Sequence, residues 1–406
     1  MCISVILLAA VRFSVAGQTV DIGLLIDLSG SGSEAGKAAR WACEMAVDHV
    51  NAQGGVGGRL VGLTVFDTRG DPLCGSRGAR ELVLDRRVSA VVGPMGWDTA
   101  MMAKPFFQEI EVPAMMLTSE DSVIRGGKYG LYGYIFQLPI RQRTSLERIG
   151  TFVQRRGWTR IGLVTESDGA GREAQGWFTR VGPAYGIDET VCASLGPKED
   201  TTESLRRLVD RDLPVIVSWC SLPHAAAVTQ ILRGLGFDRP LFLCHEILPH
   251  RYVSMVGPDT RESLIVTNKM LVWEDLDDTD PQRALIRDFV HQYRDVYGYA
   301  ARYPVCPFLG YVWDSAMILV RAMREAGTDG TDMRDAIEAT YHHVGLGGIY
   351  SFSYEDHNGL NPDSAVIARV DHIRGDGKKW VGSWRVVNEC ARMTAGSSLP
   401  ERREIQ

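Results

Sequence analysis

The sequence predicts an α/β protein made of two units in tandem, each with a parallel-type sheet covered by helices. The chain has 406 residues and 45% hydrophobic side chains, which is too long for one compact core and suits two domains. Strongly apolar short segments alternate with amphipathic helical segments, as expected for strands that are buried on both faces. The alternation restarts near residue 134 with no low-complexity linker. We therefore expect lobes joined by several short crossings.

The first unit is predicted from four apolar strands, with helices between them. In the first helix, small and apolar side chains recur at helical spacing on one face, at Ala39, Cys43, Ala46, Val47 and Val50. The strands are predicted at residues 21–27, 60–67, 88–93 and 112–117, and the helices at residues 35–51, 75–84 and 99–108.

The second unit repeats this rhythm after the segment YIFQLPI at residues 134–140. Its strands are predicted at residues 160–166, 214–220 and 240–245, and a weaker strand precedes the helix at 201–209. The other helices are predicted at residues 144–156, 173–185 and 224–235. Two long amphipathic helices follow at 282–296 and 311–326, and residues 347–387 have the composition of strands and turns.

Four glycines crowd the segment NAQGGVGGRL, which begins at Asn51. A phosphate-binding glycine loop follows a strand and opens a helix, because the helix N-terminus supplies the N–H groups. This segment does the reverse, since it follows a predicted helix and precedes a predicted strand. We therefore predict a turn with Gly54 in the left-handed conformation that ends helices, and no phosphate site.

Charge and the first residues exclude some classes of protein. The formal net charge of −6 and the pI near 5.9 argue against nucleic-acid binding, which favours basic chains. Residues 3–11 are apolar but too few to span a bilayer, and Ser14 and Ala16 form a small-x-small cleavage pattern. We predict a signal peptide over residues 1–16 and a periplasmic protein.

Eight cysteines are present, seven after cleavage, and their pairing is left open.

Candidate binding groups lie where the predicted strands end, because ligands bind beyond the carboxyl ends of strands in open parallel sheets. Asp98 or Thr99 is expected to cap the helix after residue 93, so that the amides of residues 97–100 suit a carboxylate. Other strand ends offer hydroxyls, carboxylates and an aromatic ring, at Thr118, Ser119, Glu120, Asp121, Ser167, Trp219, Ser221 and Glu246. Facing strand ends would form a cleft that fits a small zwitterion such as an amino acid.

Several motifs together resemble the type I periplasmic binding proteins, in their leucine/isoleucine/valine-binding branch. They are IGLLIDLSG, NAQGGVGGRL, FDTRGDP, VVGP, YRDVYG and WDSAMILVRAMREAG, and the resemblance covers roughly residues 20–385. It implies two Rossmann-like lobes, a three-crossover hinge, closure on a ligand, and neither catalysis nor a cofactor. The expected division is 18–139 with 269–345 for one lobe, 140–268 with 346–390 for the other, and a tail at 391–406.

Carried over residue by residue, the resemblance implies a pocket that departs from the family pattern. The hydroxyl that binds the ligand carboxylate falls on Trp97, and the neighbouring hydroxyl-rich segment falls on Ser119, Glu120 and Asp121. A pocket tyrosine falls near Ala170, and Trp219 or Ser221 replaces another aromatic residue. The acid that binds the ammonium group falls on Glu246, which matches. We expect an amino-acid-like or amine-bearing ligand rather than strict leucine specificity.

Each candidate residue also has a structural explanation. Glu246 could be an acid in a solvated loop, and Asp121 could cap a helix. Trp97 could be a surface aromatic residue outside the pocket, and Trp219 could belong to the core. Cys244-His245-Glu246 contains the residue types of a catalytic triad, but consecutive residues on an extended chain point to alternate faces. Cys220 and His224 lack an accompanying oxyanion-hole motif, and the histidines lack zinc-ligand spacing. No catalytic residue and no metal site is predicted.

Three functions remain in competition. The first is an extracytoplasmic receptor that delivers a small molecule to the membrane permease of an ABC importer, as a monomer. The second is a sensor or regulator of the same fold that responds to amides or aromatic acids. An enzyme is the third and would need turnover that depends on Cys220 or Cys244.

Overall fold

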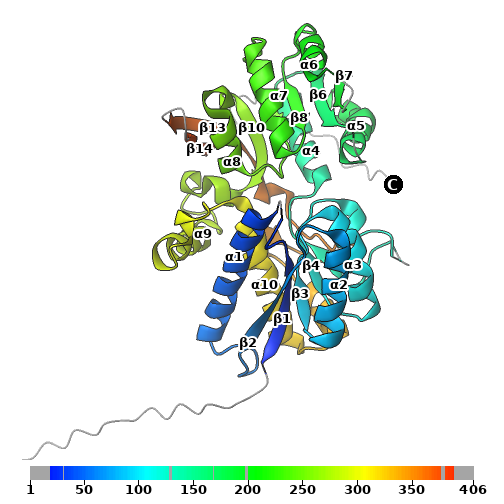
Figure 1. Ribbon diagram of the computed structural model, residues 1–406, viewed down its shortest axis with the longest axis vertical. Coiled ribbons are helices and arrows are strands. Elements are labelled where there is room, and N and C mark those ends of the chain that lie inside the picture. The colour runs from blue at the N-terminus through cyan, green and yellow to red at the C-terminus, as the bar shows by residue number, and fades with distance from the viewer. Residues whose placement is uncertain are drawn as a thin grey trace, which may run out of the picture.

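The computed structural model consists of two lobes, each built on its own sheet (Figure 1). It describes residues 19–30, 32–127, 130–167, 169–196, 200–375 and 380–387. The predicted signal peptide, residues 1–16, and the predicted tail, residues 391–406, lie outside these ranges. We call the lobe with the five-stranded sheet lobe 1 and the lobe with the seven-stranded sheet lobe 2.

Lobe 1 contains a fully parallel sheet in the order β2-β1-β3-β4-β5. Side chains on β1 alternate between two cores, with Leu24 among the residues under α1 and α10 and Leu25 among those under α2 and α3. The two helix pairs therefore cover opposite faces (Figure 1). The elements are β1 (Val20–Ile26), α1 (Ser33–Ala52), β2 (Val61–Asp67), α2 (Pro72–Arg80), β3 (Ala90–Val92), α3 (Trp97–Glu109), β4 (Ala114–Met116), β5 (Ile135–Gln137), α10 (Pro307–Ala326) and α11 (Gly330–Glu338).

Lobe 2 contains a mixed sheet in the order β14-β13-β10-β9-β8-β6-β7. Five strands run parallel, while β13 pairs antiparallel with both β10 and β14. The α/β fold class is confirmed, and this hairpin is the part of the sheet that is not parallel. The elements are α4 (Gln142–Arg155), β6 (Arg160–Glu166), α5 (Gly169–Val181), β7 (Glu189–Leu195), α6 (Thr201–Val209), β8 (Ile216–Trp219), α7 (Leu222–Gly234), β9 (Leu241–Leu243), α8 (Pro249–Val256), β10 (Ser263–Asn268), β13 (Ala365–Gly375) and β14 (Trp380–Val386).

Some elements differ from the sequence predictions. Helices α8 and α11 and strand β10 were not predicted, because each is short and lacks a long periodic pattern. The helix expected at 282–296 is α9 (Arg283–His291), followed by a wider turn over Gln292–Val296. A small hairpin of β11 (His343–Val344) and β12 (Ile349–Tyr350) precedes the return to lobe 2.

The glycine-rich segment after α1 is a turn, as predicted. Gly54, Gly55, Gly57 and Gly58 have positive φ angles of 95°, 72°, 56° and 79°. Gly55 also lies so close to the Arg59 carbonyl that a Cβ would be 1.9 Å from its oxygen. The segment reverses the chain between α1 and β2, and the glycines are needed because other residues rarely adopt these angles.

Buried side chains join the three segments of chain that cross between the lobes. The first crossing joins β5 to α4, the middle one begins after β10, and the third runs from β12 to β13. Asn358 is 1% exposed, and its Nδ2 donates to the carbonyls of Gln137 and Pro139, both at 3.0 Å. The backbone N–H of Gln137 donates to the His357 carbonyl at 2.9 Å. In the middle crossing, Asn268 Nδ2 donates to the Pro307 carbonyl at 3.0 Å. The first and third crossings are thus bound directly to each other.

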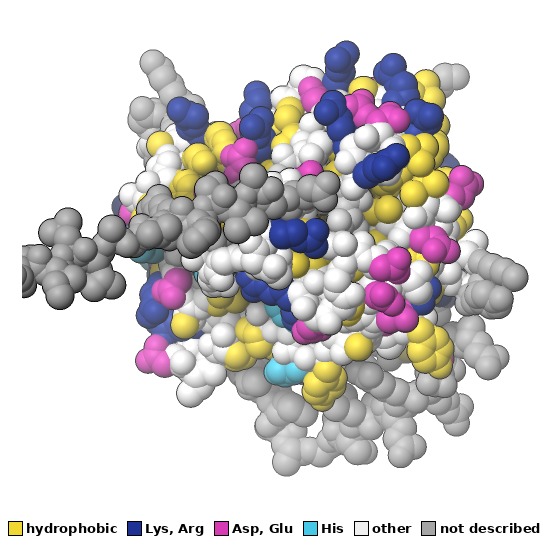
Figure 2. Space-filling view, turned by 90° about the horizontal axis from the view of Figure 1, so that it is seen from below, with side chains coloured by type: hydrophobic (Ala, Val, Ile, Leu, Met, Phe, Trp, Pro, Cys, Tyr) yellow, Lys and Arg dark blue, Asp and Glu magenta, His cyan; other side chains and the backbone are white. Residues whose placement is uncertain are grey.

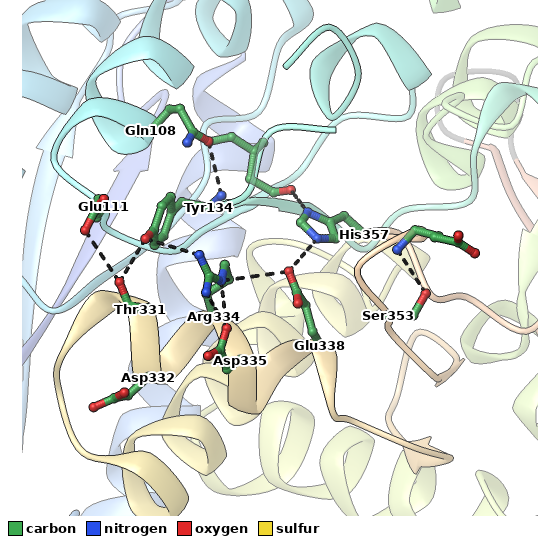
Figure 3. Close-up of polar contacts among 12 residues, drawn as sticks. Gln108, Glu111, Tyr134, Thr331, Asp332, Arg334, Asp335, Glu338, Ser353 and His357 are labelled. Carbon is green, nitrogen blue, oxygen red and sulfur yellow. Dashed lines mark hydrogen bonds and ion pairs between the residues drawn. The ribbon is translucent and has the colours of Figure 1, made fainter. Parts of the chain in front are cut away.

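Helix α11 supports the third crossing from the side of lobe 1 (Figure 3). The ring of His357 faces two acceptors, the Ile135 carbonyl at 2.9 Å from Nδ1 and Glu338 Oε1 at 3.1 Å from Nε2. The same helix contacts the start of β5 through Thr331, whose Oγ1 lies 2.9 Å from the hydroxyl of Tyr134. The hinge region therefore rests on a helix that packs against lobe 1.

The helices of the described residues and one face of the surface bear on the kind of environment that the protein meets. No helix in the described ranges is both long and apolar enough to cross a membrane. Figure 2 shows one face, on which Lys and Arg side chains lie interspersed with Asp, Glu and apolar side chains.

Replacing Asn358 with Ala should lower the free energy of unfolding by about 2–3 kcal/mol. The change removes two hydrogen bonds and leaves two buried carbonyl oxygens without this donor. Urea denaturation followed by circular dichroism measures the effect. The control is Gln154→Ala, on an exposed position of α4, which should change stability by less than about 0.5 kcal/mol. A similarly small change for Asn358→Ala would show that these bonds do not hold the crossings.

Candidate ligand-binding cleft

The strand ends of both sheets open onto two adjoining cavities between the lobes. The first has a volume of about 280 Å³ and is lined by residues that follow β4, β6, β8 and β9. The second, about 330 Å³, extends toward α1, α3 and α10. The cavities share a rim made of Ser119, Glu120, His245, Glu246 and Ile247. We call the two cavities together the interlobe cleft.

A hydrogen bond crosses the interlobe cleft at this shared rim. Ser119, which is 3% exposed, follows β4 in lobe 1, and its hydroxyl donates to Glu246 Oε1 in lobe 2. The backbone N–H of Ser119 donates to Glu120 Oε2 at 3.2 Å. Its carbonyl accepts from the backbone N–H of Gln142 at 3.1 Å. Ser119 therefore brings two carboxylates, one from each lobe, to the same place.

The electrostatics of the rim are dominated by these acids. Burial, together with the charges of Glu246 and Glu173, raises the pKa of Glu120 to about 7, although the Ser119 N–H acts in the opposite direction. Among the described residues, no Lys or Arg lines either cavity. Burial also lowers the pKa of His245, so its ring carries little positive charge near neutral pH. A cation would consequently be favoured at the rim.

The lobe 2 wall combines an aromatic ring with a capping carboxylate. Trp219, 5% exposed, lines the smaller cavity. In the amide orientation that satisfies both groups, Gln142 accepts from Trp219 Nε1 at 2.8 Å and donates to Glu173 at 3.3 Å. Glu166 accepts from the N–H and hydroxyl of Ser221, at 2.8 and 2.5 Å.

Glu166 acts as a structural group at the start of α7. His224 Nδ1 lies 2.7 Å from the same Glu166 oxygen that Ser221 contacts. Burial alone would raise the pKa of Glu166, but the hydrogen bonds from Ser221 and His224 outweigh it and lower the pKa. Its charge is thus already compensated, in contrast to that of Glu120.

The lobe 1 wall is mostly apolar. Trp97, at the first position of α3, lines the larger cavity and donates from Nε1 to the Ser122 hydroxyl at 2.9 Å. Thr118 also lines this cavity; it is 5% exposed and its hydroxyl has no hydrogen-bond partner. The remaining lobe 1 wall is formed largely by Met95, Leu117, Phe308 and Tyr311. Ile140, between β5 and α4, and the lobe 2 residues Ile247 and Leu248 complete the apolar lining of this cavity.

The structure brings together most of the predicted site residues but leaves four of them outside the cavities. Trp97, Ser119, Glu120, Trp219, Ser221 and Glu246 line the interlobe cleft. Asp98 is exposed, and Thr99 packs its methyl group toward Gly75 of α2. Asp121 faces Arg141 at 3.8 Å, and Ser167 is exposed in the bend after β6. Whether the lining residues contact a ligand remains a prediction.

The expected cap of α3 was wrong. The helix begins at Trp97, with Gly96 at the N-cap and no capping side-chain hydrogen bond. Asp98 and Thr99 are therefore in the first turn of the helix. Thr99 is 6% exposed because it meets α2, which the sequence could not place beside it.

Several lining residues were not singled out from the sequence. His245 adjoins the predicted Glu246 and could have been found from that position. Gln142, Phe308 and Tyr311 gave no such signal. Gln142 starts α4 just after the first crossing, and α10 reaches the cleft from a segment far along the chain. Only the crossings bring these side chains to strand ends that belong to other parts of the sequence.

The cysteines and the acidic groups give no sign of a reactive centre in the part described. Burial raises the pKa of Cys244 well above its ordinary value, which disfavours the reactive thiolate. Cys220 points its thiol toward the Val164 carbonyl at 3.6 Å. The six cysteines in the described ranges form no disulfide with one another. Within those ranges, no group of three or more His, Cys, Asp or Glu side chains is placed to hold a metal ion.

Known proteins share both the sequence pattern and the fold. A sequence model of the family described as periplasmic binding protein matches residues 19–378. The chemotactic signal transduction system substrate-binding protein BasB of Halobacterium salinarum is 40% identical over 82 residues, which is 20% of this chain and 20% of that protein.

Two solved structures illustrate the shared fold. An extracellular ligand-binding receptor from Rhodopseudomonas palustris HaA2 aligns with a TM-score of 0.75 and 18% identity over 91% of this chain and 100% of that chain. The second is the branched-chain amino acid transporter substrate-binding protein LivJ from Streptococcus pneumoniae, in complex with isoleucine. It aligns with a TM-score of 0.71 and 19% identity over 91% of this chain and 99% of that chain. At these identities the likeness concerns the fold.

Replacing Glu120 with Gln should make the ligand-free protein more stable at high pH. The ordinary pKa of Glu120 is 4.5 and its folded pKa is about 7, so between these values the folded protein holds a proton that the unfolded chain releases. The stability from this group is full below pH 4.5 and is lost as the pH rises through 7. At pH 8 the variant should gain about 3 kcal/mol over the unchanged protein, and much less at pH 4.5.

Urea unfolding at several pH values measures this difference. The buried Asp314, whose pKa burial raises to about 7, contributes equally in both proteins and cancels. Glu109→Gln, on the exposed side of α3, is the matched control and should follow the unchanged protein. A constant difference across the pH range would contradict the raised pKa of Glu120.

Proposed function

The chain belongs to the periplasmic binding protein family, and on this premise we propose that it is an extracytoplasmic solute-binding receptor of an ABC importer. It captures an amino acid or an amino-acid-like small molecule in the interlobe cleft and delivers it to a membrane permease. The observation that carries the proposal is the interlobe cleft itself, lined by strand ends of both lobes that meet at Ser119 and Glu246. The receptor is proposed to act as a monomer in the periplasm.

Ligand capture follows from the geometry of the interlobe cleft. A ligand favours closure only if it contacts both lobes at once, because a ligand with equal affinity for open and closed forms shifts nothing. Ser119 and Glu120 offer contacts from lobe 1, and Trp219 and Glu246 from lobe 2. In the present arrangement, the Ser119–Glu246 hydrogen bond already links the lobes. A ligand exchanges this bond for its own contacts with both residues.

The site residues have binding roles in this proposal, and none has a catalytic role. Glu246 accepts from the amine of the ligand, Trp219 and Trp97 contact its apolar part, and the rim fixes its orientation. The buried thiols of Cys220 and Cys244 are disfavoured as nucleophiles. No cofactor is required, because binding and release need only the change in lobe contacts.

A second candidate function is ligand sensing. The local match to BasB, whose name places that protein in chemotactic signal transduction, favours it. The two functions are distinguished in the source cell by deleting the gene. Transport predicts loss of uptake of the radiolabelled ligand with an unchanged behavioural or transcriptional response, whereas sensing predicts the reverse.

A ligand from a panel of amino acids, amides, amines and aromatic acids should stabilise the protein, and Glu246→Ala should remove the effect for amine-bearing ligands. At about a hundredfold excess over its Kd, a ligand adds roughly 2.7 kcal/mol. Thermal unfolding detects this on protein that has been unfolded in guanidinium and refolded to remove carried-over ligand.

The matched control for this experiment is Glu203→Gln, on the exposed face of α6 away from the cavities. It should retain the full stabilisation by ligand. A ligand that stabilises the protein and Glu246→Ala equally would remove Glu246 from the site. A panel that produces no shift at all would count against a receptor for these compounds.

A further inference from the structure

The hydrogen-bond donors of Ser119 at the rim and of Ser221 on the opposite wall already hold carboxylates of the protein. The backbone N–H of Ser119 donates to Glu120 Oε2 at 3.2 Å, and its hydroxyl donates to Glu246 Oε1. On the opposite wall, the N–H and hydroxyl of Ser221 both donate to Glu166. The cavities offer no Lys or Arg among their described lining residues. A ligand carboxylate placed at the rim would therefore meet two carboxylates of the protein instead of free donors.

The same rim is well suited to a cation. Glu120 and Glu246 come from different lobes and meet without a basic side chain between them in the described lining. Arg141, which could reach this region, contacts Asp121 at 3.8 Å and Asp356 at 3.6 Å. An ammonium group has three donors and no acceptor. It could therefore bind both carboxylates, one from each lobe, and replace the repulsion between them.

The larger cavity indicates the rest of the ligand. Beyond the rim its wall is apolar, formed by side chains such as Met95, Leu117 and Phe308. Independently of the acids, the hydroxyls of Thr118 and Thr267 line this cavity without a partner, and these residues are 5% and 3% exposed. Buried hydroxyls are normally hydrogen-bonded, so each of them marks a place for a polar atom on an otherwise apolar body.

We propose that the ligand is a cationic amine without a carboxylate, with its ammonium group between Glu120 and Glu246 and an apolar body, bearing one polar atom, against Thr118. This proposal rests on the proposed receptor function and limits its ligands to amines that lack the carboxylate of an amino acid. It also gives closure a cause, since the ammonium group contacts an acid of each lobe at the same time.

Three matched probes test the proposal by calorimetry on the stripped full chain. Tyramine has the amine, the apolar ring and a hydroxyl; tyrosine adds the carboxylate; 3-(4-hydroxyphenyl)propionate has the carboxylate without the amine. Tyramine should bind at least tenfold more tightly than tyrosine, and the propionate should not bind. Phenethylamine, which lacks the hydroxyl, should bind more weakly than tyramine, and Thr118→Val should abolish that difference.

Variants of the rim test whether the two acids bind tyramine, as distinct from stabilising the fold. Glu120→Gln and Glu246→Gln should each weaken tyramine binding at least tenfold, while Glu203→Gln should leave it unchanged. Unfolding curves establish that each variant is folded. If both rim variants bind tyramine as tightly as the unchanged protein does, the proposal is overturned.

Proton release gives a second readout that a merely structural role would not produce. The groups around Glu120 are Glu246, His245, Glu173 and the Asp121–Arg141 pair. A bound ammonium group should keep Glu120 ionised, so tyramine binding at pH 6.5 should release protons, measured by titrations in buffers of different ionisation enthalpy. Glu120→Gln should abolish the release.

The outcomes distinguish this inference from the receptor function. Binding of tyrosine or another amino acid, without binding of the corresponding amine, would overturn the amine proposal and leave the receptor function intact. Binding of neither amines nor amino acids would count against both. Tight binding of tyramine with proton release would support both.

Discussion

The arrangement of the molecule depends on the buried hydrogen bonds that join its crossings. Asn358 binds the carbonyls of Gln137 and Pro139, and His357 connects the same crossing to β5 and α11. These side chains are almost fully buried, and the hydrogen bonds of the Asn358 amide nitrogen and of the His357 ring offset part of the cost of burying them. They fix where β5 leaves lobe 1 and where the chain enters lobe 2. The separation and orientation of the two sets of strand ends, and thus the interlobe cleft, follow from them.

Within this common architecture the chemistry of the cleft is particular to the chain. The fold requires only that strand ends face one another, and it leaves the side chains at those ends free to vary. Here Ser119 serves as a shared donor for two acids, and the burial that the lobes impose makes their proximity costly. A ligand that compensates this charge is stabilised by the same burial that penalises the ligand-free site. Under the proposed binding of an amine, specificity and lobe closure depend on the same pair of carboxylates.

Sequence periodicity located most strands and helices, because buried parallel strands and amphipathic helices have strong local patterns. The turn after α1 followed from the order of helix, glycines and strand. The prediction failed where local patterns were short, as in β10 and α11, or where a neighbouring element decided the outcome. Thr99 looked like a helix cap in sequence, yet it packs against Gly75 because α2 lies beside α3. Asp121 lies 3.8 Å from Arg141 and outside the lining of both cavities, and its contact with a ligand stays a prediction.

The sequence by itself determined the α/β class, the two units and the candidates at the strand ends, since each depends on residues close together in the chain. It also placed Glu246 and Ser119 among the site residues, although 127 positions separate them. Only the tertiary structure decided that these two residues meet. It also decided that Ser221 and His224 form hydrogen bonds with Glu166 and that the Thr118 hydroxyl is left unpaired. The reason is physical: burial, pairing and charge compensation arise between segments that the crossings bring together, and no local pattern encodes those distances.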